Sequence, residues 1–274
     1  MKVILSFILF INLISCATTE TKEISPTHKK AQIYYNQGTN ELIQKDYTSA
    51  LKHLLEANAL QPNDSKIHNN LGMAYYFKNR PNKAKIYIKK AIELDPKNTD
   101  ARMNLGSLYM ESKNFKEAKI QFKLVSDDLT YPNQYRTFYN LGVLNYELGN
   151  INEAITNLKQ SISEFPQYCS AHFKLGDIYF QNKNYSEALE RFKISSQGTC
   201  YNNPEPIYHQ ALTYIELKQY DTAKLKLEEL VERFSTGNYN QLAKNKLDAL
   251  KTYSKNTEYN NYQNTDRKIL SPNF

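Results

Sequence analysis

The sequence predicts an all-α fold, a right-handed α-solenoid of six helix pairs with a C-terminal capping helix. Three series of residues, each recurring every 34 to 36 positions, lead to this prediction. An alanine recurs at this interval, a glycine or alanine stands twelve residues before it, and a large apolar residue stands four residues after it. Such a period is typical of stacked units that bury their apolar faces against their neighbours. The alanines are Ala50, Ala84, Ala118, Ala154, Ala188 and Ala223; the preceding small residues are Gly38, Gly72, Gly106, Gly142, Gly176 and Ala211; the large residues are Leu54, Ile88, Phe122, Leu158, Phe192 and Leu227.

The recurring glycine indicates how the two helices of a pair pack. A glycine inside a helix costs about 1 kcal/mol relative to alanine, so five glycines at one repeat position require a packing reason. We expect them to let the second helix of each pair approach closely, with the recurring alanine acting in the same way from the facing helix. Neighbouring pairs then stack into a solenoid.

The composition excludes several other classes of protein. The chain has 274 residues, of which 41% are hydrophobic, enough to bury a core. Eight glycines and nine prolines exclude a collagen-like chain, and three cysteines are too few for a disulfide-dense scaffold. The net charge is +7, but the basic residues are interspersed with acidic ones, so we expect no nucleic-acid partner.

The first residues predict export and a lipid anchor. Lys2 precedes an apolar run over residues 3–14, which is too short to span a bilayer and is typical of a signal-peptide core. The run ends in Leu13-Ile14-Ser15-Cys16, which resembles the lipobox of bacterial lipoproteins. The resemblance implies that residues 1–15 are a signal peptide and that Cys16 is acylated, with palmitate among chains that together anchor the protein stably. The alternatives are an ordinary cleaved signal or an uncleaved anchor with an incidental cysteine.

The residue after the cysteine indicates which of the two membranes holds the protein. In lipoproteins an aspartate at this place marks retention at the inner membrane, and this chain has Ala17 there. The resemblance therefore implies an outer-membrane protein of the bacterial cell envelope that faces the periplasm.

The repeats resemble the tetratricopeptide repeat, whose pattern is W-x₂-L-G-x₂-Y…A-x₃-F…P with a period of 34 residues. Residues 69–75, 104–109, 140–142 and 174–179 carry the Leu-Gly part of this pattern, and Pro62, Pro96 and Pro166 close three of the units. The predicted units are residues 31–64, 65–98, 99–134, 135–168, 169–203 and 204–237.

The ends of the array and two units depart from the pattern. The third unit is two residues longer around residues 127–132, and the sixth has Ala211 in place of glycine. Residues 238–253 follow a helical period and are predicted to cap the last apolar face. Residues 16–30, after the lipid, and residues 254–274 are polar and without periodicity, which predicts a flexible tether and a disordered tail.

Two cysteines are predicted to form a disulfide. Cys169 opens the first helix of the fifth unit, and Cys200 lies just past the end of its second helix. These two ends are neighbours in an antiparallel helical hairpin, and an exported protein folds under oxidising conditions. The alternative is a pair of buried free thiols.

No catalytic or metal site is predicted. Cys169 and His172 form a C-x-x-H pair, but no second pair of ligands stands at metal spacing. His172 shares its repeat position with His68, where a bulky residue packs. Motifs of hydrolases, zinc proteases and phosphate-binding loops are missing from the sequence. We therefore expect no enzyme activity, no cofactor, no metal and no small-molecule substrate.

The predicted binding surface is the concave groove. At 100° per residue, repeat positions 2, 5, 6, 9 and 12 share one side of the first helix, and positions 4, 7, 8 and 11 pack inward. Asparagine at position 6 of four successive units resembles the ladder with which some tetratricopeptide proteins hold an extended peptide, since an amide both donates and accepts. Aromatic and methionine side chains beside it would receive apolar peptide side chains. The groove residues are Asn36, Asn70, Asn104, Asn140, Tyr35, Met73, Tyr76, Met103, Tyr139, Tyr146, Phe173 and Phe180.

Two features limit this interpretation. Asparagine could simply be common in this composition and tolerated in helices. The carboxylate clamp of chaperone-binding relatives needs Lys and Arg at positions where this chain has Asn69, Met73 and Asn140, while Asn104 and Arg136 are compatible. Recognition of a C-terminal carboxylate is therefore not predicted.

A lipobox, a short tether, six units and a cysteine pair in a late unit resemble the pilotins of type IV pilus biogenesis. The resemblance implies a partner that is a secretin subunit, which the protein helps to reach the outer membrane and to form a multimeric pore. The alternative is a general periplasmic scaffold for cell-wall enzymes or other envelope proteins. A third hypothesis, an enzyme or carbohydrate binder that uses the aromatic groove, lacks a polar constellation to support it.

The disulfide can be tested by counting thiols. With Cys16 acylated and Cys169 paired with Cys200, the mature protein denatured without reductant should show no free sulfhydryl. Closure of this loop would stabilise the protein by roughly 3–4 kcal/mol in the chain-entropy account. Two free sulfhydryls would show that the cysteines pack as unpaired thiols.

Overall fold

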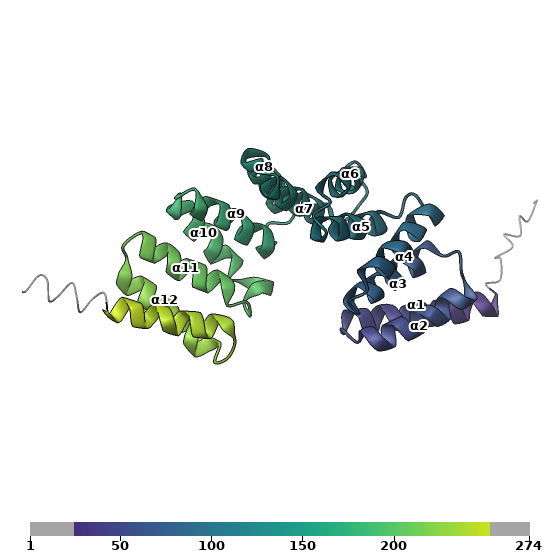
Figure 1. Ribbon diagram of the computed structural model, residues 1–274, viewed down its shortest axis with the longest axis horizontal. Helices are drawn as coiled ribbons and strands as arrows, with labels where there is room; N and C mark the ends of the chain where they lie inside the picture. The colour runs from purple at the N-terminus through teal and green to yellow at the C-terminus, as the bar shows by residue number, and fades with distance from the viewer. Residues whose placement is uncertain (1–24, 253–274) are drawn as a thin grey trace, which may run out of the picture.

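The structure is a computed structural model that describes residues 25–252. All of its regular elements in this range are helices, which confirms the all-α solenoid. Figure 1 shows the helices following one another along an arch, with α1 and α2 at one end and α12 at the other. The helices are α1 (Pro26–Ile43), α2 (Tyr47–Leu60), α3 (Ser65–Phe77), α4 (Pro81–Leu94), α5 (Thr99–Glu111), α6 (Phe115–Ser126), α7 (Gln134–Glu147), α8 (Ile151–Glu164), α9 (Cys169–Gln181), α10 (Tyr185–Ser195), the 3₁₀ turn η1 (Gly198–Cys200), α11 (Glu205–Glu216) and α12 (Tyr220–Arg233), followed by a C-terminal helix over 238–252.

The helices pack in pairs and in two layers. Each odd-numbered helix packs mainly on the even-numbered helix that follows it, and each pair then contacts the next. The first helices of neighbouring units also contact one another, from α1 with α3 through α7 with α9. In a curved stack, helices on the concave side lie closer to the equivalent helices of the next unit than helices on the convex side do. The first helices therefore form the inner layer, as α3, α5 and α7 show in Figure 1.

The first helix begins earlier than the repeat pattern predicts. α1 starts at Pro26, so residues 26–30, expected as part of a flexible tether, are helical. The reason is local: the Ser25 side chain accepts a hydrogen bond from the His28 N–H, and proline is favoured at the first helical position. The predicted signal peptide, the lipidated Cys16 and most of the tether lie outside the described residues, as does the predicted tail.

The turn inside each pair has one geometry. The second residue after each first helix has a left-handed backbone, with φ between 56° and 78°. Only one of the six is a glycine, and four are lysines, which accept the strain because hydrogen bonds to the last turn of the helix fix the chain there. The six residues are Lys45, Asn79, Lys113, Gly149, Lys183 and Lys218.

Inside each pair, the recurring glycine meets the recurring large residue. A Cβ placed on Gly106 would lie 2.5 Å from the Phe122 ring, and one on Gly142 would lie 2.8 Å from Leu158 Cγ. The glycines of the other units face their large residues in the same way, and the large residues and the alanines of all six units are fully buried. The packing reason inferred from the sequence is therefore present in the structure.

The last helix covers the end of the core. Ala243 is fully buried, and Tyr239, Leu247 and Leu250 pack on the apolar cluster that contains Leu227 and Leu230 of α12. Asn240 fixes the turn before this helix by donating to the main-chain oxygens of Val231 and Phe234. The helix thus lies where a cap is needed.

The close approach at the glycine position can be tested with Gly106→Ala. The added methyl group must displace the fully buried Phe122 ring, so overpacking of about 1–3 kcal/mol should exceed the gain of about 1 kcal/mol in helix propensity. The urea midpoint followed by circular dichroism should fall. Ser107→Ala places an alanine at the exposed neighbouring position and should leave the urea midpoint unchanged within experimental error. A midpoint that rises in Gly106→Ala would contradict this account of the packing.

Candidate functional site

The predicted groove residues all lie on the first helices of their units, which form the inner layer. Most of their side chains are half-buried, and Asn36 is exposed. Repeat positions 4, 7, 8 and 11, which were predicted to pack into the core, are mostly buried, as Leu71, Leu175 and His172 show. Helical periodicity therefore separated the more buried side of the first helices from the less buried side, with Met103 and Asn69 as exceptions.

The asparagines of the groove connect successive units. Asn70 Nδ2 donates to Thr39 Oγ1 at 2.9 Å, and Asn104 Nδ2 donates to Asn69 Oδ1, also at 2.9 Å. Asn140 Nδ2 lies 3.1 Å from Met103 Sδ and donates to it. The amide nitrogens of the ladder thus face the preceding unit, which the sequence pattern did not indicate. Asn36, in the first unit, instead accepts from Gln32 of its own helix.

Met103 is not a groove residue. Its side chain is only 4% exposed and packs in the cluster that contains Phe122, Val125 and Tyr131. The helical wheel placed it in the groove, but the extended third unit sets Tyr131 against it. The prediction for this one residue was wrong.

The tyrosines of the groove are partly desolvated. Burial raises the pKa of Tyr35 and of Tyr139, and the negative charge of Glu205 contributes to the shift at Tyr139. Burial also raises the pKa of Tyr76, together with a hydrogen bond to Glu111. These side chains stay neutral over the physiological range and present both a ring face and a hydroxyl group.

In the fifth unit a lysine takes the place of the ladder asparagine. Lys174 Nζ lies 3.6 Å from the centre of the Tyr146 ring and 3.3 Å from Asp177 Oδ2. The Tyr146 hydroxyl donates to Gln181 Oε1 at 2.7 Å, and Gln181 Nε2 in turn donates to Asp177 Oδ1 at 3.0 Å. This network joins the fourth and fifth units on the groove side, and the groove beyond it continues with Phe173, which meets His209 edge to face at 5.0 Å.

Residues of the first three units line a polar cavity of about 470 Å³. Sequence reasoning missed it. The available signal was the two extra residues of the third unit, because the segment that they lengthen forms one wall. The cavity is lined by Tyr35, Lys66, Asn69 and Asn70, by the turn before α5 (Asp95, Lys97, Asn98), by the start of α5 (Thr99, Asp100), and by the extended segment (Asp128, Thr130, Tyr131, Pro132, Asn133).

The extended segment is held rigidly. Asp128 accepts from Thr99 Oγ1 at 2.7 Å and from the Thr130 N–H at 3.0 Å and Oγ1 at 2.6 Å, and these hydrogen bonds lower the pKa of its carboxyl group. The Tyr131 hydroxyl donates to Asp100 at 3.0 Å. Burial, aided by the charge of Asp100, raises the pKa of Tyr131 to about 12.

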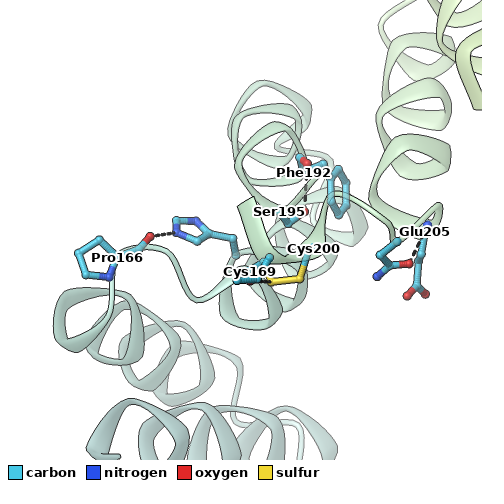
Figure 2. The surroundings of a disulfide bond; sticks show 9 residues. Pro166, Cys169, Phe192, Ser195, Cys200 and Glu205 are labelled. Atoms are coloured by element: carbon cyan, nitrogen blue, oxygen red, sulfur yellow. Dashed lines mark hydrogen bonds between the residues drawn. A yellow bond between two sulfur atoms is a disulfide. The ribbon is translucent and has the colours of Figure 1, made fainter. Parts of the chain in front are cut away.

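The structure joins Cys169 and Cys200 by a disulfide with a Cα–Cα distance of 6.2 Å, between the start of α9 and η1 (Figure 2). His172 Nε2 lies 2.9 Å from the Pro166 carbonyl oxygen, and burial lowers the pKa of its ring. Over residues 25–252, no three His, Cys, Asp or Glu side chains converge to hold a metal ion. Within the same range, every helix is too short or too polar to cross a membrane.

Four stretches of the chain match the tetratricopeptide repeat family: residues 65–98, 99–126, 142–183 and 207–236. Each contains first-helix and second-helix segments that pack as described above. The chain is a tetratricopeptide-repeat protein.

Relatives of this tetratricopeptide-repeat protein include pilus proteins. The type IV pilus assembly protein PilF of Pseudomonas aeruginosa is 23% identical over 202 residues, which cover 72% of this chain and 80% of PilF. The solved structure of P. aeruginosa PilF superposes with a TM-score of 0.69 at 19% identity, over 81% of this chain and all of that chain. PilW, a widely conserved type IV pilus biogenesis factor, superposes with a TM-score of 0.70 at 19% identity, over 77% of this chain and 97% of that chain.

The ladder in this tetratricopeptide-repeat protein can be tested with Asn104→Ala. The substitution removes the donor to Asn69 Oδ1, and Asn69 is only 7% exposed, so the free energy of unfolding should fall by about 1–3 kcal/mol. Asn36→Ala changes the same repeat position at an exposed site and should alter the free energy of unfolding by about 0.5 kcal/mol or less. Equal effects of the two substitutions in chemical denaturation would show that the contact between units contributes nothing.

Proposed function

We propose that this protein is a lipid-anchored scaffold that holds an extended segment of a protein partner in its groove and assists assembly of the type IV pilus secretin at the outer membrane. The observation that carries the proposal is the continuous inner surface of amide and aromatic side chains on a chain similar to PilF and PilW over most of its length. The names of these relatives support a place in the bacterial cell envelope and a protein partner.

The groove is suited to a peptide main chain. The amide nitrogens of Asn104 and Asn140 donate to the preceding unit, but their oxygens accept no hydrogen bond from the described residues. An extended segment can therefore donate its N–H groups to these oxygens without disturbing the contacts between units. Its carbonyl groups can accept from the neighbouring tyrosine hydroxyls.

The aromatic side chains proposed to receive the partner lie six residues further along each first helix, more than one turn away. Position 12 of the second, fourth and fifth units carries Tyr76, Tyr146 and Phe180, all half-buried. Half-buried aromatic rings offer apolar area that a partner can cover with little loss of side-chain entropy. Apolar side chains of the bound segment would pack on these rings.

The anchor is the part of the proposal that rests on the sequence alone. Leu13-Ile14-Ser15-Cys16 supports acylation of Cys16, and Ala17 supports the outer membrane. An anchored scaffold would keep a secretin subunit close to the membrane in which it inserts, which raises the effective concentration of the two partners for each other.

The function can be tested by deletion and complementation. Loss of the gene should abolish the secretin multimers that resist denaturing gel conditions, and the wild-type chain should restore them. The triple variant Tyr76→Ala, Tyr146→Ala and Phe180→Ala should restore them poorly, because it removes three aromatic contacts of the groove.

The matched control is Ile86→Ala, Ile120→Ala and Leu225→Ala. These three residues occupy one repeat position on the second helices and are 66%, 50% and 65% exposed, so the variant removes comparable apolar area from another surface. It should complement like the wild type. Multimers that persist in the deletion strain would reject the secretin role and favour a general periplasmic scaffold, while equal complementation by the two triple variants would reject the groove.

A further inference from the structure

We propose that the exposed sides of α4 and α6 form a basic face that docks on a membrane surface containing anionic phospholipids. The inference rests on the proposed function, because a lipid-anchored chain lies beside a membrane, and it specifies which side of the array meets that membrane. The basic face consists of the exposed lysines of these two helices: Lys83, Lys89, Lys90, Lys116, Lys119 and Lys123.

The positive charge of the second helices is concentrated in two of them. α4 and α6 together carry seven lysines and two glutamates, a net charge of +5. The other second helices, α2, α8, α10 and α12, together carry seven basic and nine acidic residues, a net charge of −2. A local excess of this kind attracts an anionic surface, although the chain as a whole intersperses its charges.

The two helices adjoin each other in the array. They belong to successive units, and both pack on α5. In Figure 1, α6 lies on the outer side of α5. The seventh lysine, Lys85 of α4, has its Nζ 5.1 Å from the centre of the Tyr109 ring of α5, so its charge lies at the border between the two units. The charges of α4 and α6 therefore form one surface.

Exposed apolar side chains lie among these lysines. Ile86 and Ile120 occupy one repeat position and are 66% and 50% exposed, and Leu124 is 45% exposed. Lys89 follows Ile86 by three residues and Lys123 follows Ile120 by three, so each lysine lies beside an isoleucine on the same side of its helix. Helices that lie on membranes combine these features, because the apolar group enters the headgroup region while lysine extends to the phosphates.

The ammonium groups are available to a ligand. Lys90 Nζ lies 3.2 Å from Glu93 Oε2, but the two side chains are 48% and 66% exposed, and such a surface pair contributes little. Among residues 25–252, four lysines of the basic face have neither an ion pair nor a hydrogen bond: Lys89, Lys116, Lys119 and Lys123.

The proposed anchor brings this part of the array to the membrane. Residues 16–25, between the acylated cysteine and α1, span at most about 35 Å when fully extended. The first units therefore stay near the bilayer, and the basic face belongs to the second and third units. A membrane on the outer side of α4 and α6 leaves the inner layer of first helices open to a protein partner.

The proposal can be tested by sedimentation with lipid vesicles. The mature chain with Cys16→Ser carries no acyl group, and it should bind phosphatidylcholine vesicles that contain phosphatidylglycerol but not vesicles of phosphatidylcholine alone. Added salt should weaken this binding, because salt screens exposed charges. Lys89→Gln with Lys119→Gln and Lys123→Gln should lower the affinity by about tenfold or more.

The matched control is Lys52→Gln with Lys159→Gln and Lys224→Gln. These lysines are exposed on α2, α8 and α12, so the two triple variants lose the same charge and the same residue type from second helices. The control should bind the anionic vesicles like the unsubstituted chain. Circular dichroism should show that both variants are folded.

A second measurement locates the contact. Ile86 and Leu225 occupy one repeat position and are 66% and 65% exposed. In Ile86→Cys and Leu225→Cys, each made in the Cys16→Ser chain, the introduced thiol is the one available for labelling, because Cys169 and Cys200 are paired. The emission of an environment-sensitive fluorophore should shift to shorter wavelength with phosphatidylglycerol vesicles at position 86 and stay unchanged at position 225.

Several results would overturn the proposal. They are equal binding to the two kinds of vesicle, equal loss in the two lysine variants, and equal fluorescence shifts at positions 86 and 225. Lysine-dependent binding of polyglutamate without binding to phosphatidylglycerol vesicles would assign the basic face to an acidic protein instead.

The secretin multimers report separately on the proposed function. The variant Ile86→Ala, Ile120→Ala and Leu225→Ala keeps every lysine of the basic face, and the acyl chains still hold it at the membrane, so it should complement. Multimers that persist in the deletion strain, together with lysine-dependent vesicle binding, would reject the secretin role alone. Loss of multimers on deletion, without vesicle binding, would reject the membrane-docking face alone.

Discussion

The contact between a glycine of the first helix and a large buried residue of the second is the constraint on which the rest of the structure depends. It sets the distance between the helices of each pair, because even one methyl group at Gly106 would meet the Phe122 ring. Five pairs share the contact, and Ala211 takes the place of the glycine in the sixth. Units of similar shape then stack on one another, and their first helices form one inner layer.

Continuity of that surface explains the double role of the asparagines. The amide nitrogens of Asn104 and Asn140 each donate to the preceding unit, while their oxygens accept no hydrogen bond from the described residues and are free for the proposed partner. The aromatic residues at position 12 also take part in packing. Tyr146 contacts Lys174 and Gln181 of the fifth unit, and Tyr76 packs against a buried apolar cluster.

The third unit breaks the regularity, and the consequences are local. Hydrogen bonds of Asp128 and Tyr131 hold the lengthened segment. Tyr131 packs in the cluster that buries Met103, and both residues line the polar cavity. A solenoid of identical units would offer the same surface at every step. The irregular third unit gives the array one place that differs from the others, a polar cavity at its border with the second unit.

The sequence by itself determined the period, the helix pairs, the inward and outward faces, the capping helix and the proximity of Cys169 to Cys200. All of these depend on contacts within one hairpin or on helical periodicity, which residue spacing specifies directly. Only the tertiary structure decided that Asn104 donates a hydrogen bond to Asn69, that Met103 is buried and that a cavity opens beside Lys66. These features depend on the rotation between successive units, and that rotation arises from the packing of side chains some 35 residues apart, which no local pattern encodes.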